Sequence, residues 1–230
     1  IYYLGFNTQD KQQAALGNPA LWQAARWLVD YNSLSTQLLK GQYQTHQTFL
    51  PAGFDGALDN QPFHYDVAKA KAILAKGGIK PGTRFSLTII NQPPYSDVAQ
   101  ALQASFAKAD IQIDIQPVAE SELWGKMRGR NFQSIFIYWG ADYVDANSNA
   151  STFAYNVEGG PKTLAWRVGW NIPELSAKTR AAAAESDVKK RTALYQELQT
   201  DIQQNSPYVV SLQGQKQVGL GNNVQGDYQG

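Results

Sequence analysis

The segment FQSIFIYWGADYVDANSNASTFAYN, residues 132–156, holds the side chains best suited to binding chemistry. An apolar run ends in Trp139 and Gly140, and the carboxylates of Asp142 and Asp145 follow, with Tyr143 between them. An acid just beyond the carboxyl end of a strand lies where α/β sheets place their ligands. It would be ionised there and would bind an ammonium group through charge-assisted hydrogen bonds, with aromatic surface around the rest of the ligand. We therefore predict a site for a cationic or amine-bearing ligand.

Other interpretations of these side chains remain open at this point. Asp142 is also placed to cap a helix near Ala150, and capping is the favoured role of Asp145, which precedes Ala146. A glycoside hydrolase needs two carboxylates that flank a bond, and two acids within one short loop are a poor arrangement for that. Trp139 and the neighbouring tyrosines would also suit the stacking of sugar rings, so a carbohydrate-binding lobe is a further alternative.

The composition of the 230-residue chain excludes several functions. The 20 basic residues are balanced by 19 acidic ones, which gives no electrostatic case for nucleic acid or an anionic membrane as partner. Cysteine is absent, and neither His46 nor His64 has a ligand-type residue one helical turn away, so we predict no metal and no cofactor. No phosphate-binding, dinucleotide or nucleophile motif occurs. We therefore predict a binding protein and not an enzyme.

The periodicity of apolar residues predicts one α/β domain. Strands are expected at residues 1–7, 84–89, 111–116, 132–139, 207–212 and 218–221. Helices are expected at 19–31, 33–40, 66–76 with Asp66 as its cap, 96–106 with Ser96 as its cap, 119–128, 173–184 and 187–204. Residues 42–63 have no clear period and are expected to form a long ordered loop. The strand–helix order in the middle of the chain favours parallel strands with right-handed crossovers.

Five segments, in order, resemble the bacterial extracellular solute-binding proteins of family 5, the peptide, nickel and opine receptors of ABC importers. IYYLGFNT is similar to the strand that enters the family's second lobe, and NPALWQAARWLVDY to its R-x-A-x-x-x-A-x-D-r helix, with Trp22 in place of the Arg. FHYDVAKAKAILAKGGI resembles the family's y-D-p-e-k-A-k-x-L-L-a-e-A-G helix. YWGADYVDANSN resembles its W-x-x-D-y-p-D-P segment, with Val144 and Ala146 in place of the prolines. SDVKKRTALYQELQTDIQQNSPYVV is similar to its last helix and exit strand.

The resemblance implies a ligand-binding set. Asp142 would pair with the α-ammonium group of the ligand, and the backbone of residues 138–140 would bind an extended ligand as an added strand does. Trp139 would line a side-chain pocket. Asn7 lies where the family contacts the ligand backbone, and Arg128 lies near a loop that approaches ligand carboxylates. The expected ligand-binding residues are Asn7, Arg128, Tyr138, Trp139, Gly140, Asp142 and Tyr143.

The resemblance also implies an architecture and partners. We expect residues 1–230 to form a single lobe of the periplasmic-binding-protein type II kind, with a mixed, mostly parallel sheet and flanking helices. Residues 1–8 and 207–221 would be hinge-side strands, and the first lobe of the receptor would be missing. The expected protein is a monomeric receptor, periplasmic or extracellular and membrane-associated. It would bind an oligopeptide, a dipeptide or a related amine-bearing solute between two lobes and deliver it to an ABC permease.

Overall fold

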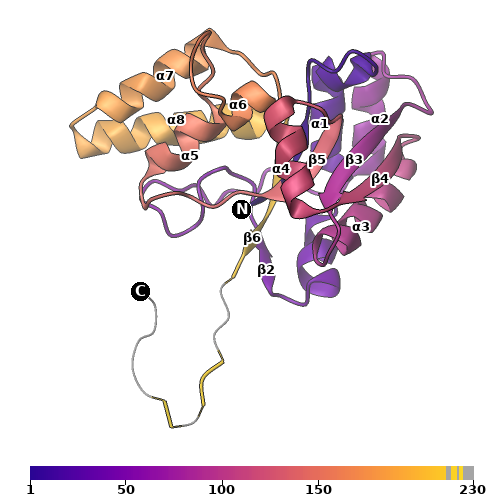
Figure 1. Cartoon of the computed structure of the whole chain (residues 1–230), viewed down its shortest axis with the longest axis horizontal. Helices are drawn as coiled ribbons and strands as arrows, with labels where there is room; N and C mark the ends of the chain where they lie inside the picture. Colours follow the sequence, from indigo (N-terminus) through magenta and orange to yellow (C-terminus); the bar gives the residue numbers. More distant parts are fainter. Residues whose placement is uncertain (216–218, 222, 225–230) are drawn as a thin grey trace.

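The sheet at the centre of the molecule has six strands in the order β2-β6-β1-β5-β3-β4 (Figure 1). The structure is a computed structural model, and it describes residues 1–215, 219–221 and 223–224. The strands are β1 (Tyr2–Phe6), β2 (Tyr43–Thr45), β3 (Arg84–Ile90), β4 (Gln112–Val118), β5 (Ser134–Tyr138) and β6 (Tyr208–Gly214). Part of the strand expected at 218–221 lies outside the described residues, and residues 219–221 are not a strand.

The direction of the strands divides the sheet into two halves. β3 pairs in parallel with β4 and β5, which confirms the predicted strand–helix–strand–helix–strand unit. β1 pairs antiparallel with β5 and β6, and β2 pairs antiparallel with β6. The sheet is therefore mixed, and the expectation of a mostly parallel sheet is wrong outside β3, β4 and β5. Crossover helices impose parallel pairing only on the strands that they connect, and no such crossover leads from β1 to its neighbours.

The helices follow the predicted order with small shifts. They are η1 (Ala14–Gly17), α1 (Pro19–Leu28), η2 (Ser33–Leu38), α2 (Val67–Lys76), α3 (Tyr95–Ala107), α4 (Glu120–Gly129), α5 (Ala146–Phe153), α6 (Leu164–Arg167), α7 (Pro173–Ala184) and α8 (Val188–Asn205). Asp66 caps α2 as predicted, since its side chain accepts a hydrogen bond from the Lys69 N–H. The predicted cap Ser96 is wrong, because α3 already begins at Tyr95 behind Pro94. None of the helices in the described ranges is long and apolar enough to cross a membrane.

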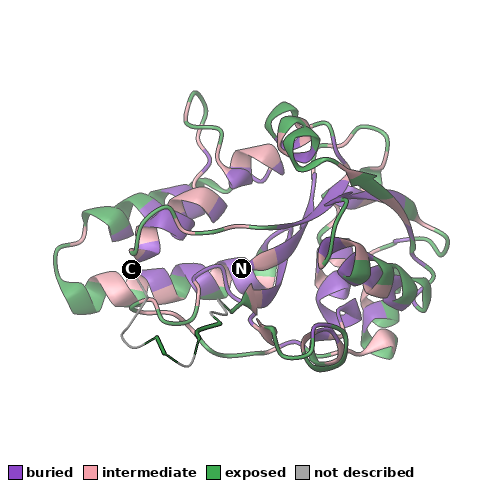
Figure 2. Ribbon diagram, turned by 60° about the horizontal axis from the view of Figure 1, so that its bottom comes forward, coloured by how far each residue is buried: buried purple, intermediate pink, exposed green. Residues whose placement is uncertain are grey.

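Alternating side chains of β1 bury two different faces of the sheet. Phe6 packs edge-on against Phe85 of β3, which in turn packs against Phe106 of α3. Tyr3 points the other way and packs against Phe153 of α5. Figure 1 shows the result, with α5, α7 and α8 to one side and the sheet with α1, α2 and α3 to the other. Figure 2 shows that buried residues occur on the helices of both parts and on the sheet.

A buried arginine connects α1 to the end of α8. Arg26 is 1% exposed, and its Nε donates to the carbonyl of Gln203 at 2.8 Å. Its Nη2 donates to the carbonyls of Ser206 at 2.5 Å and Tyr208 at 3.2 Å. Burial lowers the pKa of Arg26 to about 10, so the side chain remains a cation at neutral pH. It satisfies carbonyls at the carboxyl end of α8, where a positive charge is favourable, and fixes the turn into β6.

The predicted loop at residues 42–63 is ordered, and β2 forms its first part. Asn149 of α5 donates from Nδ2 to the carbonyl of Phe49 at 2.6 Å. Gln199 of α8 donates to the carbonyl of Gly56 at 2.8 Å and accepts from the Leu58 N–H at 3.0 Å. These side-chain contacts replace the ladder of a regular element and hold the loop against α5 and α8.

Candidate ligand-binding site

The segment between β5 and α5, residues 139–145, carries the candidate site and is called the lip below. Asp142 is exposed, and its carboxylate has no hydrogen-bond or salt-bridge partner among the described residues. Its backbone N–H donates to Oγ of the buried Ser148 at 2.9 Å. The main chain at Asp142 is thus fixed while its carboxylate is open to solvent. The alternative in which Asp142 caps the following helix is wrong, since another residue has that role.

That residue is Asp145, as predicted. Its Oδ1 accepts from the Asn147 N–H at 2.7 Å and caps α5. Arg191 of α8 places Nη2 at 2.7 Å from Oδ1 and 2.9 Å from Oδ2. The hydrogen bond from Arg191 is the main reason that the pKa of Asp145 lies below its ordinary value. Asp145 is therefore a structural carboxylate that joins the lip to α5 and α8.

The backbone of the lip is paired on one side only. Trp139 donates to the Ile1 carbonyl at 2.8 Å and accepts from the Ile1 nitrogen at 3.0 Å. The next pair, Tyr2 and Tyr138, forms no hydrogen bonds with each other, because such pairs alternate with hydrogen-bonded pairs in an antiparallel ladder. The N–H and C=O groups of Tyr138 therefore point to the β3 side of β5, where the pairing with β3 ends at Phe136. Tyr138, and not Trp139, therefore has the backbone groups that an added strand would meet.

Aromatic side chains surround the end of β5. The ring of Tyr2 lies at the middle of the group, with ring centroids of Tyr43, Tyr95 and Tyr138 at 5.2, 5.9 and 6.2 Å. Trp124 of α4 packs edge-on against Tyr138 at 6.2 Å. Tyr138 is 38% exposed, whereas Tyr95 is buried. The group gives the end of the sheet an amphipathic surface next to the lip.

Trp139 and Tyr143 lie on either side of Asp142 in the chain and differ in exposure. Trp139 is half-buried, and its indole N–H is buried without a partner among the described residues. Tyr143 is 52% exposed, and its hydroxyl accepts from Nδ2 of Asn147 at 3.2 Å. Gly140 lies between them and is exposed. The structure thus brings together Tyr138, Trp139, Gly140, Asp142 and Tyr143 from the expected ligand-binding set.

The other two residues of that set lie elsewhere. Asn7 follows the end of β1 opposite to Tyr2, and it is buried at 4% exposure. Its Nδ2 donates to the carbonyls of Arg130 at 3.2 Å and Phe132 at 2.9 Å, so the side chain fixes the connection from α4 to β5. Arg128 is exposed on α4, with Nε donating to the Trp124 carbonyl at 3.2 Å. It lies one helical turn from the aromatic group and not on the lip.

Sequence reasoning missed four residues that shape the site. Ser148 and Arg191 hold the lip, and Tyr2 and Tyr95 complete the aromatic group. The only local signal is the spacing of Ser148, six residues after Asp142 in the same loop and helix. Arg191 is 46 residues from its partner Asp145, so its role depends on how α8 packs.

Residues 1–161 match the family described as bacterial extracellular solute-binding proteins, family 5 Middle. The chain belongs to this family. The family resemblance drawn from the sequence is confirmed, and the family is one of solute-binding proteins that act outside the cytoplasm, in agreement with the expected periplasmic location.

A relative in Escherichia coli (strain K12) is the probable D,D-dipeptide-binding periplasmic protein DdpA, which is 25% identical over 228 residues. The match covers 98% of this chain but 43% of DdpA, so this family 5 chain spans less than half the length of that relative. The structure of HbpA2 from Haemophilus parasuis superposes with a TM-score of 0.83 at 20% identity, covering 93% of this chain and 42% of HbpA2. The expected fold class, that of the type II periplasmic binding proteins, is therefore confirmed.

One solved structure has nearly the same extent as this family 5 chain. It is described as a peptide ABC transporter, peptide-binding protein, and superposes with a TM-score of 0.77 at 19% identity. The match covers 92% of this chain and 97% of that one. The fold described above therefore also occurs as a separately solved unit.

Proposed function

We propose that this family 5 chain is the ligand-binding lobe of an ABC-importer receptor for peptides or related amine-bearing solutes. The observation that carries the proposal is the exposed carboxylate of Asp142, which has no cation beside it among the described residues and sits on a lip fixed through Ser148 and Arg191. The names of DdpA, a dipeptide-binding protein, and of the peptide-binding structure of equal extent support this ligand class.

In the proposed complex, the ligand's ammonium group pairs with Asp142 and its backbone pairs with the open edge of Tyr138. The ligand's side chain would lie against Trp139 and the aromatic group. β1 and β6 are adjacent central strands of the sheet, and we propose that they lead to a second lobe that closes over the site. Two unit charges 4 Å apart attract by about 1 kcal/mol in water and about 4 kcal/mol at a protein surface, so closure strengthens the Asp142 pair.

The contacts of Asp145 support binding and not hydrolysis. A glycosidase would need a second carboxylate opposite Asp142, and Asp145 is occupied by the Arg191 guanidinium and by the start of α5. The proposed receptor acts as a monomer that delivers its ligand to a membrane permease of the importer.

Calorimetry on a receptor in which this lobe is joined to a first lobe tests the proposal. We expect the dipeptide Ala-Phe to bind, and N-acetyl-Ala-Phe and the Asp142→Asn receptor each to bind about 10- to 100-fold more weakly, about 1.4–2.8 kcal/mol. Asp59→Asn is the matched control, because Asp59 is an exposed acid away from the lip. Equal affinity of the two dipeptides, or displacement of Ala-Phe by oligosaccharides, would contradict the proposal.

The 230-residue chain by itself offers only one wall of the proposed cleft. We expect it to bind Ala-Phe weakly or undetectably, because water is not excluded from the Asp142 pair. Micromolar affinity of the isolated chain would show that the lip suffices without closure.

A further inference from the structure

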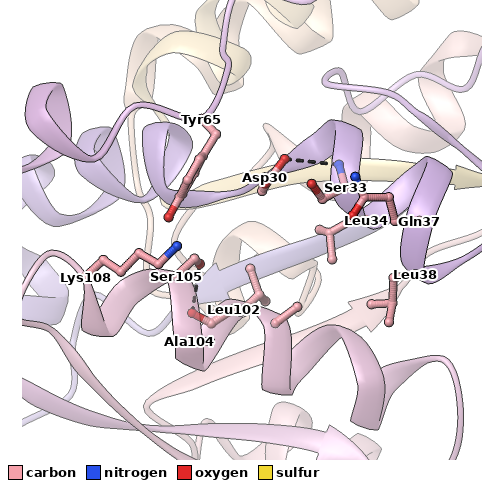
Figure 3. A pocket seen from close by; sticks show the side chains of 11 residues that line it. Asp30, Ser33, Leu34, Gln37, Leu38, Tyr65, Leu102, Ala104, Ser105 and Lys108 are labelled. Atoms are coloured by element: carbon pink, nitrogen blue, oxygen red, sulfur yellow. Dashed lines mark hydrogen bonds between the residues drawn. The ribbon is translucent and has the colours of Figure 1, made fainter.

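A cavity lies apart from the lip and the aromatic group. It has a volume of about 370 Å³ and lies between η2 and α3, with Tyr65 closing one end (Figure 3). Its lining includes no residue of the lip. Ligand pockets for small molecules range from about 300 to 1,000 Å³, so this volume suits one small molecule and not a peptide.

One end of the cavity holds a hydroxyl group and a cation. The Tyr65 hydroxyl is buried and has no hydrogen-bond partner among the described residues. The Lys108 Nζ lies 5.5 Å from the centroid of the Tyr65 ring, and Lys108 forms no salt bridge in the described part of the chain. Figure 3 shows the hydroxyl and the amine pointing toward each other at this end. A buried hydroxyl without a partner is costly, and a carboxylate between the two groups would satisfy both.

The upper wall of the cavity carries an acid. Asp30 follows α1, and its Oδ1 accepts from the Ser33 N–H at 3.1 Å, which holds the carboxylate at the start of η2. Its other oxygen has no partner in the described ranges. In Figure 3, Asp30 lies between Tyr65 and Leu34, with Leu38 further along and Leu102 on the α3 side of the cavity. An ammonium group at this position would be paired with a carboxylate.

The remaining wall is apolar and has an uncommon backbone. Leu34 and Leu38 come from η2, and Leu102 comes from α3. η2 is a π-helix, a form that is rare and occurs frequently at functional sites. Leu38 is 38% exposed although it borders a cavity, so its apolar surface is uncovered in the structure.

We propose that this cavity binds a free α-amino acid with an apolar side chain. The carboxylate of the amino acid lies between Lys108 and the Tyr65 hydroxyl, and its ammonium group pairs with Asp30. Its side chain packs against Leu34, Leu38 and Leu102. The cation with its hydroxyl, the acid and the leucines are three separate groups on the cavity wall, as the three substituents of the Cα carbon of such a molecule require. This site is independent of the cleft in which the proposed peptide ligand binds.

NMR titration of the 230-residue chain with L-leucine tests the proposal. We expect saturable chemical-shift changes of the amides around η2 and α3. Leucinamide, which lacks the carboxylate, and 4-methylpentanoate, which lacks the ammonium group, should each bind at least tenfold more weakly than L-leucine. Lys108→Met and Asp30→Asn should each weaken L-leucine binding by at least tenfold. Asn at position 30 retains an oxygen for the Ser33 N–H, so this variant should stay folded.

Two control variants decide between sites. Lys80→Met removes an exposed lysine away from the cavity, and Asp142→Asn removes the acid of the lip. Both should leave L-leucine binding unchanged. The proposal would be overturned by the absence of a saturable shift at η2, or by binding of either analogue as tight as that of L-leucine. Loss of binding in Asp142→Asn with retention in Lys108→Met would also overturn it. Failure of the peptide experiment leaves this result unaffected, because the two sites share no residue.

Discussion

Replacing Arg191 with Met tests whether the ion pair with Asp145 holds the lip in place. The two oxygens of Asp145 lie 2.7 and 2.9 Å from Nη2, and the side chains of the pair are 31% and 33% exposed. Solvent screening at this exposure limits the contribution to about 0.5–1 kcal/mol of unfolding free energy. We expect Arg191→Met to lose that amount. We also expect about three- to tenfold weaker peptide binding in the two-lobed receptor, because Asp142 loses a support.

A double-mutant cycle by urea unfolding isolates the pair. Asp145→Asn keeps an oxygen for the Asn147 N–H, so it removes the charge and not the helix cap. Combined with Arg191→Met, it should give a coupling free energy of about 0.5–1 kcal/mol. A coupling within about 0.3 kcal/mol of zero would refute the reasoning.

The same pair predicts a pH dependence of stability. Arg191 holds the pKa of Asp145 below its ordinary value of 3.8, so the unfolded chain takes up this proton at a higher pH than the folded chain does. The stabilisation is complete above about pH 4–5 and disappears as the pH falls through the lowered folded pKa. Arg191→Met should therefore lose less stability than the unmutated chain between about pH 5 and pH 2. Identical acid limbs in urea unfolding would count against the pair.

Three further predictions concern stability, each measured by urea unfolding. Burial lowers the pKa of His46 below its ordinary value of 6.5, so the unfolded chain binds that proton at a higher pH than the folded chain does. The free energy of unfolding should therefore fall as the pH drops below about 6.5. His46→Gln should remove this part of the pH dependence, and an unchanged profile would contradict the prediction. Arg26→Met should lower the free energy of unfolding by about 2–4 kcal/mol, because the loss of its hydrogen bonds to carbonyls exceeds the gain from removing a buried charge. A loss below about 1 kcal/mol would refute this prediction. Gly77→Ala should cost about 2–3 kcal/mol, since the new Cβ would lie 2.1 Å from the Ala20 Cβ. Gly125→Ala, in open space on α4, should instead stabilise the protein by about 0.5–1 kcal/mol. Equal effects of the two substitutions would show that contact with α1 is not the cause.

Local patterns predicted most of the elements because their signals lie within a few residues. The helix expected at 173–184 has those bounds in the structure, and Asp66 and Asp145 cap the helices that follow them. Short elements carried too little pattern. β2 has three residues and α6 has four, so neither contains two periods of its own pattern. The antiparallel position of β1 also had no local signal, since it is decided by pairing with β5 and β6.

The candidate site was predictable where a single loop builds it. A strand, a glycine and an acid in succession indicated the open carboxylate of Asp142, and the structure leaves it exposed. The supports of the loop come from distant segments, and no spacing in the sequence connects Arg191 to Asp145. Asn7 shows the opposite case. Its position suggested contact with a ligand, but its amide is bonded to carbonyls 123 and 125 residues away in the chain.

The pairing of Trp139 with Ile1 has a mechanical consequence for the proposed receptor. It attaches the lip to the start of β1, one of the two strands about which the lobes would turn. Points near a pivot travel little during a rotation, whereas the far ends of α7 and α8 sweep a wide arc (Figure 1). A rotation of the whole lobe would thus leave the carboxylate of Asp142 almost stationary beside the ligand. The lobes can then open and close while the contact between Asp142 and the ligand's ammonium group stays intact.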